Sequence, residues 1–415
     1  MISLKPLVIG VIAFLANWID KVVGLRFVYL NVNSIGHLIT ETEIFLDQII
    51  NSEEVNFGVL IFIQGNNLLH PANIRICNQE LFQIIKKKMK QELKRKKIIS
   101  IWTKSKILQS RDFTQLIYPE SRKFNFMRYK YGHLILPLGM SSKKHFDTRG
   151  AKNKKYFSLS YEQRNDCKKI LEDHGFMGNQ GLVSIVVRDA AYTVENLVQD
   201  SISKNDRNAD IKDYEKAIQY FLDKGFTVFR MGSVVQSKVV IQNDNFLDYP
   251  FSKIRSELMD LYLISESKII FGTPSGIMEV WSLGEEPYIC FTDVVDLHNL
   301  VAQKSKTIIN LASLRDEKGN NITDVRRIYD YTFLREFAPA LALSLNYKWV
   351  KASSEELLTS AQEVVQHYFN EIRESEYSTK TKEVINAHID KNVTNISGGK
   401  YFSIFSNVTK VGLDK

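Results

Sequence analysis

A regular alternation of short apolar runs with helical patterns constrains the fold of this 415-residue chain more than any other feature of its sequence. In the second half, the apolar runs 181–187, 226–230 and 268–271 are typical of buried strands, and amphipathic segments separate them. Strands that alternate with helices favour parallel sheets built from βαβ units. The sequence therefore predicts an α/β fold.

Local signals place the ends of several helices. Ser160 and Gln163 form a capping-box pair that predicts the start of a helix, and His174-Gly175 predicts its end. Further helices are predicted at 38–50, 80–96, 211–224, 259–265 and 354–372. Further strands are predicted at 26–32, 57–63, 98–102 and 287–291, the last being the final strand, with a loop at 33–37 and a polar, loop-like tail at 376–415.

The length of the chain predicts two domains, because it exceeds the size at which a single hydrophobic core stops growing. Residues 141–158 are polar, basic and patternless, which is typical of a loop or linker. The predicted domains are 1–158 and 159–350, followed by a closing helix and tail at 351–415.

Cysteine and histidine positions argue against a metal site. Cys77, Cys167 and Cys290 lie far apart and form no CxxC pair, which predicts a reducing compartment and no structural zinc. The eight histidines show no metal-ligand spacing. We therefore expect no metal and no other cofactor.

Most of the net charge of +8 comes from one segment. Residues 86–97, KKKMKQELKRKK, contain eight basic residues and one acidic residue, a local charge of +7. One interpretation is a solvated helix face, and another is attraction to an anionic membrane surface. Nucleic-acid binding is the weaker interpretation, because no interleaved aromatic residues or recognition-helix motif accompany the run.

The N-terminal stretch PLVIGVIAFLANWIDKVVG is apolar but too short for a spanning helix. It has the apolar core of a signal peptide, yet no A-x-A-like cleavage site follows it. Two interpretations stay open, namely a buried first helix and a membrane-interface helix with Trp18 at the level of the headgroups.

Polar residues follow three successive predicted strands of the second half. They are Arg188-Asp189, residues 230–233 and residues 272–276. In open parallel sheets the carboxyl ends of the strands form the edge where ligands bind. Glycine and serine also occur in such turns for reasons of folding alone, so the alignment of three clusters is the stronger signal.

The third cluster has the composition of an anion site. In IIFGTPSGIMEV (269–280), an apolar run breaks into small and hydroxyl residues and then resumes as a helix. Thr273, Ser275 and the amides that open the helix are able to meet an anion, and Gly276 places no Cβ in the way. Arg188 and Arg230 are expected to add bidentate charge to the same anion.

The motifs of the nearest competing classes are not present. The sequence contains no GxxxxGK[ST] phosphate loop, no GxGxxG between a strand and a helix, and no GxSxG nucleophile elbow. Phosphate binding without these motifs, in a chain with two α/β halves, indicates a nucleotide-sugar site between two Rossmann-like domains.

Several segments resemble a bacterial glycosyltransferase family of surface-polysaccharide loci. They are, in order, VVRDAAY (186–192), RNADIKDYEKAI (207–218), GFTVFRMGS (225–233), LDYPFS (247–252) and SELMDLYLISESKIIFGTPSG (256–276), while NVNSIGHLITETEIFLDQ (31–48) resembles the family's N-terminal IGH loop. More distantly, the VRD arginine and the strand–S/TxSG–helix are similar to fucosyltransferases of the GT-B fold.

This resemblance implies a GT-B-like fold, with two Rossmann-like domains facing each other across a cleft and a C-terminal closing helix. It also implies that Arg188 and Thr273 to Gly276 hold the phosphates of the donor. Two departures concern the donor pocket: Glu257 stands where the family usually has Asp, and CFTDVVDLHN (290–299) lacks the usual Val-Asn. The donor sugar is therefore not identified.

The candidate catalytic residue is His37, with Glu41 one helical turn further on. In a GT-B arrangement its loop faces the donor, so His37 is expected to deprotonate an acceptor hydroxyl, to bind the sugar or to donate to a phosphate. The alternative is a structural histidine at a helix cap. Ser34 and Gly36 are the expected acceptor-side residues. The expected donor-binding residues are Arg188, Asp189, Tyr192, Arg230, Gly232, Ser233, Asp248, Thr273, Ser275, Gly276 and Glu279.

Several acidic residues have two interpretations. Asp189 either contributes to the site or is a structural partner of the neighbouring arginine. Asp210, Asp248 and Asp260 are candidates for contacts to ribose or base, and alternatively cap helices or pair with arginines. No feature of the sequence decides between these roles.

The expected function is transfer of a sugar from a nucleotide-activated donor to a glycan or lipid-linked acceptor during synthesis of a bacterial surface polysaccharide. The expected location is cytoplasmic, with peripheral contact to the inner face of the plasma membrane left open and no nucleic-acid partner. The alternatives are a nucleotide-sugar epimerase or hydrolase of the same fold, and a non-catalytic glycan- or RNA-binding protein.

Overall fold

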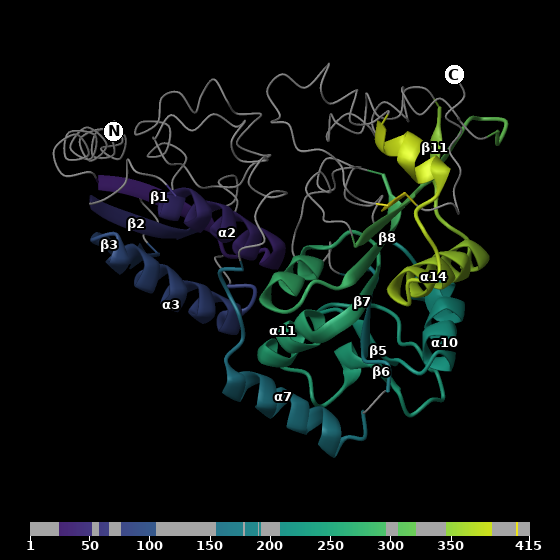
Figure 1. The fold of residues 1–415 in the computed structure, drawn as a ribbon, viewed down its shortest axis with the longest axis horizontal. Coiled ribbons are helices and arrows are strands. Elements are labelled where there is room, and N and C mark those ends of the chain that lie inside the picture. The colour runs from purple at the N-terminus through teal and green to yellow at the C-terminus, as the bar shows by residue number, and fades with distance from the viewer. Residues whose placement is uncertain are drawn as a thin grey trace, which may run out of the picture. The chain divides into compact units, whose positions relative to one another are not determined.

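The structure is a computed structural model, and it divides the chain into two compact units. The N-terminal unit contains residues 1–148 and 153–158, and the C-terminal unit contains residues 149–152 and 159–415. Figure 1 draws the described elements in colour. The structure describes residues 25–51, 58–65, 76–104, 155–176, 179–189, 191, 208–295, 306–320, 346–383 and 404–405.

The N-terminal unit contains a parallel three-stranded sheet with two helices on one face. Phe62 of the middle strand stacks on Trp102 of the next strand, with ring centroids 4.5 Å apart. Phe62 also contacts Phe45 of the first helix, and Trp102 contacts Phe82 of the second. Both helices therefore pack on this face. The elements are β1 (Leu25–Asn31), α2 (Ile35–Asn51), β2 (Gly58–Gly65), α3 (Gln79–Arg95) and β3 (Ile98–Thr103), with strand order β1-β2-β3.

The strands predicted at 26–32, 57–63 and 98–102 and the helices predicted at 38–50 and 80–96 are confirmed. The N-terminal apolar stretch and most of the predicted linker at 141–158 lie outside the described residues. The predicted loop at 33–37 is shorter than expected, because α2 already begins at Ile35. The start of α3 is set by Asn78, whose side chain accepts a hydrogen bond from the Leu81 N–H at 2.8 Å. After the helix, Lys97 adopts a left-handed conformation with φ of 57° and leads directly into β3.

The C-terminal unit is built on a seven-stranded parallel sheet (Figure 1). The strand order is β12-β9-β8-β7-β4-β5-β6, and every neighbouring pair is parallel. The strands are β4 (Leu182–Val186), β5 (Thr227–Met231), β6 (Phe246–Asp248), β7 (Ser267–Gly272), β8 (Tyr288–Val294), β9 (Thr307–Leu311) and β12 (Ile404–Phe405).

This strand order reverses direction once, between β4 and β7. From β4 the chain adds β5 and then β6 on one side, and it then returns to the other side of β4 to add β7, β8 and β9. A point of this kind is a topological switch point, where the connections on either side leave in opposite directions and open a crevice at the carboxyl ends of the strands.

Helices cover both faces of this sheet. On one face of the sheet, Val183, Ile185 and Phe271 belong to a hydrophobic core. Phe221 of α10 (Glu215–Asp223) and Val364 of α14 (Ser354–Tyr368) belong to the same core, so both helices pack on this face. On the other side, α11 (Glu257–Glu266) packs against β4 and β7, and α7 (Tyr161–Asp173) packs against α11. Figure 1 shows the two helix pairs on opposite sides of the sheet.

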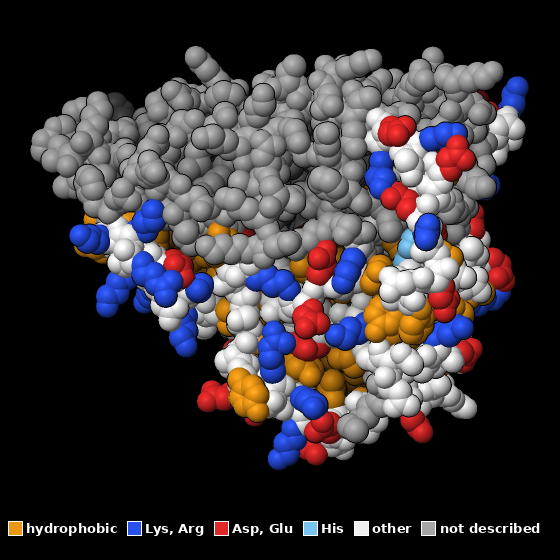
Figure 2. Space-filling view, viewed as in Figure 1, with side chains coloured by type: hydrophobic (Ala, Val, Ile, Leu, Met, Phe, Trp, Pro, Cys, Tyr) orange, Lys and Arg blue, Asp and Glu red, His pale blue; other side chains and the backbone are white. Residues whose placement is uncertain are grey.

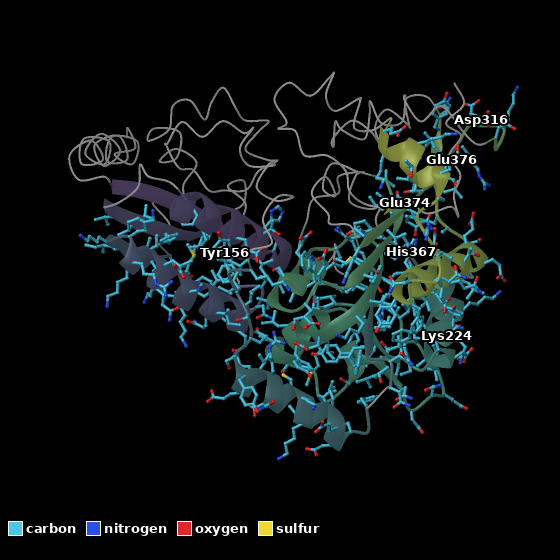
Figure 3. The ribbon with its side chains drawn as sticks, in the orientation of Figure 1. Tyr156, Lys224, Asp316, His367, Glu374 and Glu376 are labelled. Carbon is cyan, nitrogen blue, oxygen red and sulfur yellow. The ribbon has the colours of Figure 1, made fainter. Side chains whose placement is uncertain are left out.

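The last turn of α14 contains a buried histidine. His367, labelled in Figure 3, is 7% exposed. Burial lowers the pKa of its imidazole, and the carboxylate of Glu374 opposes that shift. The helix thus ends as part of the core of the C-terminal unit.

The predicted helix signals hold at both ends of α7. The Ser160 N–H donates to the Gln163 side chain at 2.9 Å, and the Gln163 N–H donates to the Ser160 hydroxyl at 3.2 Å, which confirms the capping box. Gly175, with φ of +80°, follows the helix end as expected. A second capping box, between Ser353 and Glu356, starts α14.

Three predictions for this half were wrong in part. The helix expected at 211–224 is divided into the 3-10 helix η2 (Ile211–Tyr214) and α10. The strand near 287–291 is not the last one, because β9 and β12 extend the sheet beyond it. In the tail, residues 376–383 are helical and β12 pairs with β9. The sequence also did not indicate β6, β10 (Ser313–Arg315) or β11 (Lys348–Val350), because a strand of three residues shows no periodicity.

Within the described residues, no helix combines the length and the apolar character needed to cross a membrane.

Candidate functional site

The three polar clusters predicted at strand ends lie side by side in the structure. They follow β7, β4 and β5, which are consecutive strands of the C-terminal sheet. The register aligns Val186, at the end of β4, with Met231 on one side and with Gly272 on the other. The three strands therefore end at the same level, and the switch point lies between two of the clusters.

Gly272 allows the ends of β4 and β7 to approach closely. Its φ is +145°, and a Cβ at this position would lie 1.9 Å from the carbonyl oxygen of Val186. The next residue, Thr273, donates its N–H to that same oxygen at 2.9 Å. Only glycine fits here, because any side chain would push the two strands apart.

Thr273 connects the loops that follow the two strands. Its side chain is fully buried, and its hydroxyl accepts a hydrogen bond from the Arg188 N–H at 2.9 Å. The sequence predicted that this hydroxyl binds an anion, whereas in the structure it accepts from the Arg188 backbone N–H. Thr273 thereby determines where Arg188 leaves β4.

A 3-10 helix, η4 (Gly276–Leu283), follows this loop. Ser275 is the residue before it and is extended, with φ of −144° and ψ of 146°. Within the described part of the chain, its hydroxyl makes no capping hydrogen bond, and Ser275 and Gly276 are both partly exposed. The first amides of a helix have no partners inside the helix, so this end offers N–H donors beside a hydroxyl.

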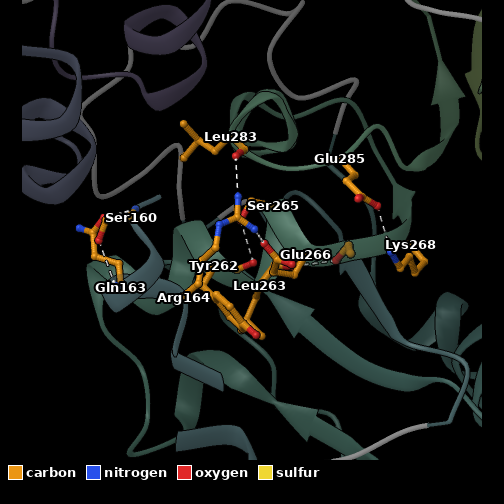
Figure 4. A network of polar contacts seen from close by, with 11 residues as sticks. Ser160, Gln163, Arg164, Tyr262, Leu263, Ser265, Glu266, Lys268, Leu283 and Glu285 are labelled. Carbon is orange, nitrogen blue, oxygen red and sulfur yellow. Dashed lines mark hydrogen bonds and ion pairs between the residues drawn. The ribbon is translucent and has the colours of Figure 1, made fainter. Parts of the chain in front are cut away.

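The other end of η4 is attached to α7 and α11 (Figure 4). Arg164 of α7 donates to the Leu283 carbonyl oxygen at 3.0 Å and forms an ion pair with Glu266 of α11. Gly284 packs so closely on Ser265 that a Cβ would lie 1.7 Å from the Ser265 carbonyl oxygen. The position of η4 is therefore set from its far end, and no motif in the sequence indicated Arg164 or Gly284.

Asp189 connects two of the three loops. One carboxylate oxygen accepts from the Ala191 N–H at 2.8 Å, and the other accepts from the Gln236 N–H at 2.7 Å. Both oxygens thus bind backbone amides, one in the loop after β4 and one in the loop after β5. This geometry favours a structural role for Asp189, while Arg188 itself is half-buried.

Arg230 differs most from its expected role. Its side chain is 1% exposed, and its guanidinium donates to Asp248 at 3.0 Å and to the Ser237 carbonyl oxygen at 3.0 Å. The second oxygen of Asp248 accepts from the Val239 N–H at 2.7 Å. Arg230 and Asp248 are level on the neighbouring strands β5 and β6, so the two charges satisfy each other inside the protein.

Gly232 and Ser233 remain accessible at the end of β5. Gly232 is partly exposed with φ of +150°, and Ser233 is exposed. Glu279 is partly exposed and lies in the first turn of η4. Tyr192 lies outside the described residues.

Two of the remaining acids have local partners. Asp210 caps η2, because its side chain accepts from the Lys212 N–H at 3.0 Å. Asp260 lies in α11 near Tyr249, and burial raises the pKa of its carboxyl to about 6, with Tyr249 and Arg255 opposing the shift. Asp210 therefore acts as one of the helix caps that the sequence left open.

One buried acid near this edge was not considered from the sequence. Asp293 lies in β8, next to β7, with φ of 54° and 2% exposure. It accepts from the Ala352 N–H at 2.7 Å, and burial raises the pKa of its carboxyl. This carboxylate connects β8 with the segment that precedes α14.

The N-terminal candidates lie at the start of α2, directly after β1. The Ser34 carbonyl oxygen accepts from the Leu38 N–H at 2.8 Å, Gly36 is buried and His37 is partly exposed. Glu41 is within α2, and its side chain lies outside the description. These residues belong to a different unit from Arg188 and Ser275.

In the described ranges, no group of three or more His, Cys, Asp or Glu side chains is arranged to hold a metal ion.

Comparisons with known proteins add one distant similarity. No family model matches the chain, and no curated protein matches it. Among solved structures, the chain is similar to "the glycosyl transferase family 9 from Veillonella parvula DSM 2008", with 9% identity and a TM-score of 0.39 over 83% of this chain and 97% of that chain. A similarity at this level does not establish a shared fold or activity.

Proposed function

We propose that the C-terminal unit binds the phosphates of a nucleotide-sugar at the switch point between β4 and β7, and that the protein is a glycosyltransferase of the GT-B type. One observation carries the proposal. Arg188 and the start of η4 follow the two strands that flank the switch point, and the Thr273 hydroxyl connects them. A cation and a helix N-terminus at such a point form an anion site.

Each residue of this site has a separate role in the proposal. The Arg188 guanidinium contacts the phosphates in a bidentate manner, and Ser275 and the Gly276 amide donate to the same group. Thr273 and Gly272 hold the two loops in position without touching the ligand. Because Arg230 and Asp248 bind each other inside the protein, we leave them out of the phosphate site.

The proposed reaction is the transfer of the sugar to a hydroxyl group. The acceptor oxygen forms a bond to the anomeric carbon, the bond from that carbon to the phosphate oxygen breaks, and the nucleotide leaves with the electron pair. Arg188 and the amides at η4 stabilise the charge that develops on the leaving phosphate. His37, or else Glu41, accepts the proton of the acceptor hydroxyl.

The proposed biological setting follows from the resemblance of the sequence motifs. The acceptor is a glycan or a lipid-linked glycan, and the product belongs to a bacterial surface polysaccharide assembled on the cytoplasmic side. The arginine and the helix amides supply the phosphate stabilisation, so the proposed mechanism requires no metal.

A panel of nucleotides tests the donor site. Thermal shifts of the full chain are measured with UDP, GDP, CMP and dTDP and with their sugar derivatives. We expect one base to stabilise the protein, and we expect Ser275→Trp to abolish the shift because the indole fills the site. Stabilisation of the Ser275→Trp variant equal to that of the wild type would place the nucleotide elsewhere.

Replacement of His37 tests the proposed base. His37→Ala is expected to lower turnover by about 10²–10⁴-fold with little change in donor affinity, and activity is expected to fall at acidic pH as the base becomes protonated. His37→Gln keeps a hydrogen bond but cannot transfer the proton. If the Gln variant retains most of its activity, His37 is a binding residue and Glu41 becomes the candidate base.

Product analysis separates the proposed reaction from its alternatives. A transferase releases nucleotide much faster when the acceptor is present. Release at the same rate without acceptor would indicate a hydrolase or an epimerase. If no nucleotide changes the thermal stability, a non-catalytic binding protein is the better interpretation.

A further inference from the structure

The basic segment 86–97 separates into two groups of cations. Glu92 is buried and binds both Lys88, at 2.8 Å, and Arg95, at 2.9 Å. These contacts lower the pKa of the Glu92 carboxyl, so the acid remains charged. The ammonium group of Lys86 lies over the rings of Phe82 and Trp102, 5.9 and 5.6 Å from their centroids. Three of the eight basic side chains are therefore occupied within the N-terminal unit.

Of the other five, Lys96 is partly buried, and the four exposed lysines form what we call the lysine stripe. Lys87, Lys90 and Lys94 follow one another at intervals of three and four residues, so they lie along one face of α3. Lys97 follows just after the helix. None of the four forms an ion pair with a residue that the structure describes. Figure 2 shows the basic side chains gathered over α3.

The exposed isoleucines of β3 do not belong to the lysine stripe. Ile99 is 61% exposed and Ile101 is 47% exposed, and their neighbours in the sheet, Val59 and Ile61, are only partly buried. Successive side chains of a strand point to opposite faces, and Trp102 contacts Phe82 of α3, so Ile99 and Ile101 lie on the face of the sheet away from α3. The stripe is therefore a purely cationic surface on the outer side of α3.

We propose that the lysine stripe docks the N-terminal unit on an anionic lipid surface. Lysines on flexible stems interact with a charged surface as point charges, without a fixed geometry. The aromatic rings of this region, Phe82 and Trp102, lie beneath Lys86 and pack edge to face within the protein, so they provide no platform for nucleic-acid bases. This arrangement favours lipid over nucleic acid. The proposal is independent of the nucleotide site.

Co-sedimentation of the full chain with vesicles tests the docking surface. The vesicles contain either phosphatidylcholine alone or phosphatidylcholine with 30% phosphatidylglycerol. We expect binding to the anionic vesicles only, with a steep decrease as salt rises. Each lysine near the surface contributes about fivefold to the partition coefficient, so the triple variant Lys87→Gln, Lys90→Gln, Lys94→Gln should bind about a hundredfold more weakly.

A matched control removes three exposed lysines of the C-terminal unit. The variant Lys169→Gln, Lys212→Gln, Lys253→Gln changes the net charge equally and should bind vesicles nearly as the wild type does. Ile99→Ser with Ile101→Ser changes the sheet face away from α3 and should leave vesicle binding unchanged. Equal loss in both lysine variants would show that only net charge matters, and it would overturn the proposal.

Two further measurements keep the outcome unambiguous. A single-stranded RNA oligonucleotide is tested in parallel, and binding of the RNA but not of the vesicles would overturn the lipid assignment. The nucleotide thermal shift is measured for every variant. A vesicle result that fails while the nucleotide shift persists rejects the docking surface alone, and the reverse result rejects the donor site alone.

Discussion

At the β4/β7 end of the C-terminal sheet, Arg188 is half-buried beside a loop whose residues Ser275 and Gly276 are partly exposed. At the β5/β6 end of the same edge, Arg230 is 1% exposed and is bound to Asp248. Both arginines end a buried apolar strand, and the sequence assigned both of them to one anion. The structure leaves one end accessible and encloses the other.

The difference lies in the position of each arginine relative to its strand. Arg230 is within β5, where its Cα is level with Asp248 on β6, so a neighbouring strand supplies the countercharge. Arg188 comes two residues after Val186, the last residue of β4, and lies beyond the paired part of the strand. Arg230 is therefore held inside the sheet by its neighbouring strand, whereas Arg188 lies beyond the paired strands, where we propose the donor site.

The largest expected effect concerns the enclosed end. Arg230→Met should lower the free energy of unfolding by about 3–5 kcal/mol, because it leaves the Asp248 carboxylate buried without its countercharge. Chemical denaturation measures this change. In the double variant Arg230→Met, Asp248→Leu, most of the loss should be recovered, since no charge remains buried. A single variant as stable as the wild type would contradict the enclosed ion pair.

The second effect concerns the accessible end. Arg188→Ala should weaken nucleotide binding by about 1.5–3 kcal/mol, since it removes a charged hydrogen bond to a phosphate. Its effect on unfolding should stay within about 0.5 kcal/mol, as is usual away from the core. Calorimetric titration and denaturation measure the two quantities. Arg188→Lys keeps the charge without the bidentate geometry, so its nucleotide affinity should lie between those of the wild type and of Arg188→Ala. A loss of stability as large as that of Arg230→Met would remove the distinction between the two ends.

A third effect arises from Asp260, next to Tyr249 on the enclosed side. The folded-state pKa of its carboxyl, about 6, lies above the value of 3.8 expected in the unfolded chain. The folded state therefore keeps the Asp260 proton up to a higher pH than the unfolded chain does. As a result, this group makes stability fall as pH rises from about 4 to about 6. Above that range the loss of stability is constant, on the order of 2–3 kcal/mol.

Asp260→Asn should remove this dependence. The variant should be more stable than the wild type at pH 7, and the difference should shrink as pH falls toward 4. Denaturation curves at several pH values check both statements. If the two proteins show the same change between pH 4 and pH 7, Asp260 is not the group responsible.

The smallest effect concerns the attachment of η4. Arg164→Gln removes the ion pair with Glu266 and weakens the hydrogen bond to the Leu283 carbonyl, at a cost of about 1 kcal/mol in stability. Nucleotide affinity should fall about fivefold if this contact orients the start of η4. Glu266→Gln keeps the bond to Leu283, so its affinity should stay near that of the wild type. Equal affinities in both variants would show that Arg164 has no influence on the accessible end.

Local signals predicted a large part of the fold. The capping box between Ser160 and Gln163 marks the start of α7, and Gly175 marks its end. Both signals depend on residues a few positions apart, so the sequence showed them. The apolar runs of the central strands indicated a parallel sheet for the same reason. The short strands β6 and β12 were missed, because each is defined by its neighbour in the sheet and not by its own residues.

The candidate site also combines features that the sequence indicated with contacts that only the structure showed. The sequence by itself determined that polar clusters would follow three strands, and the structure showed that Gly272 allows two of them to approach closely. Only the tertiary structure decided the strand order and hence the switch point at β4 and β7. It also paired Arg230 with Asp248, 18 positions away, and placed Arg164 against Leu283, 119 positions away. Such pairs form because buried charges and helix ends require partners, and the packing of the whole sheet decides which residue supplies them.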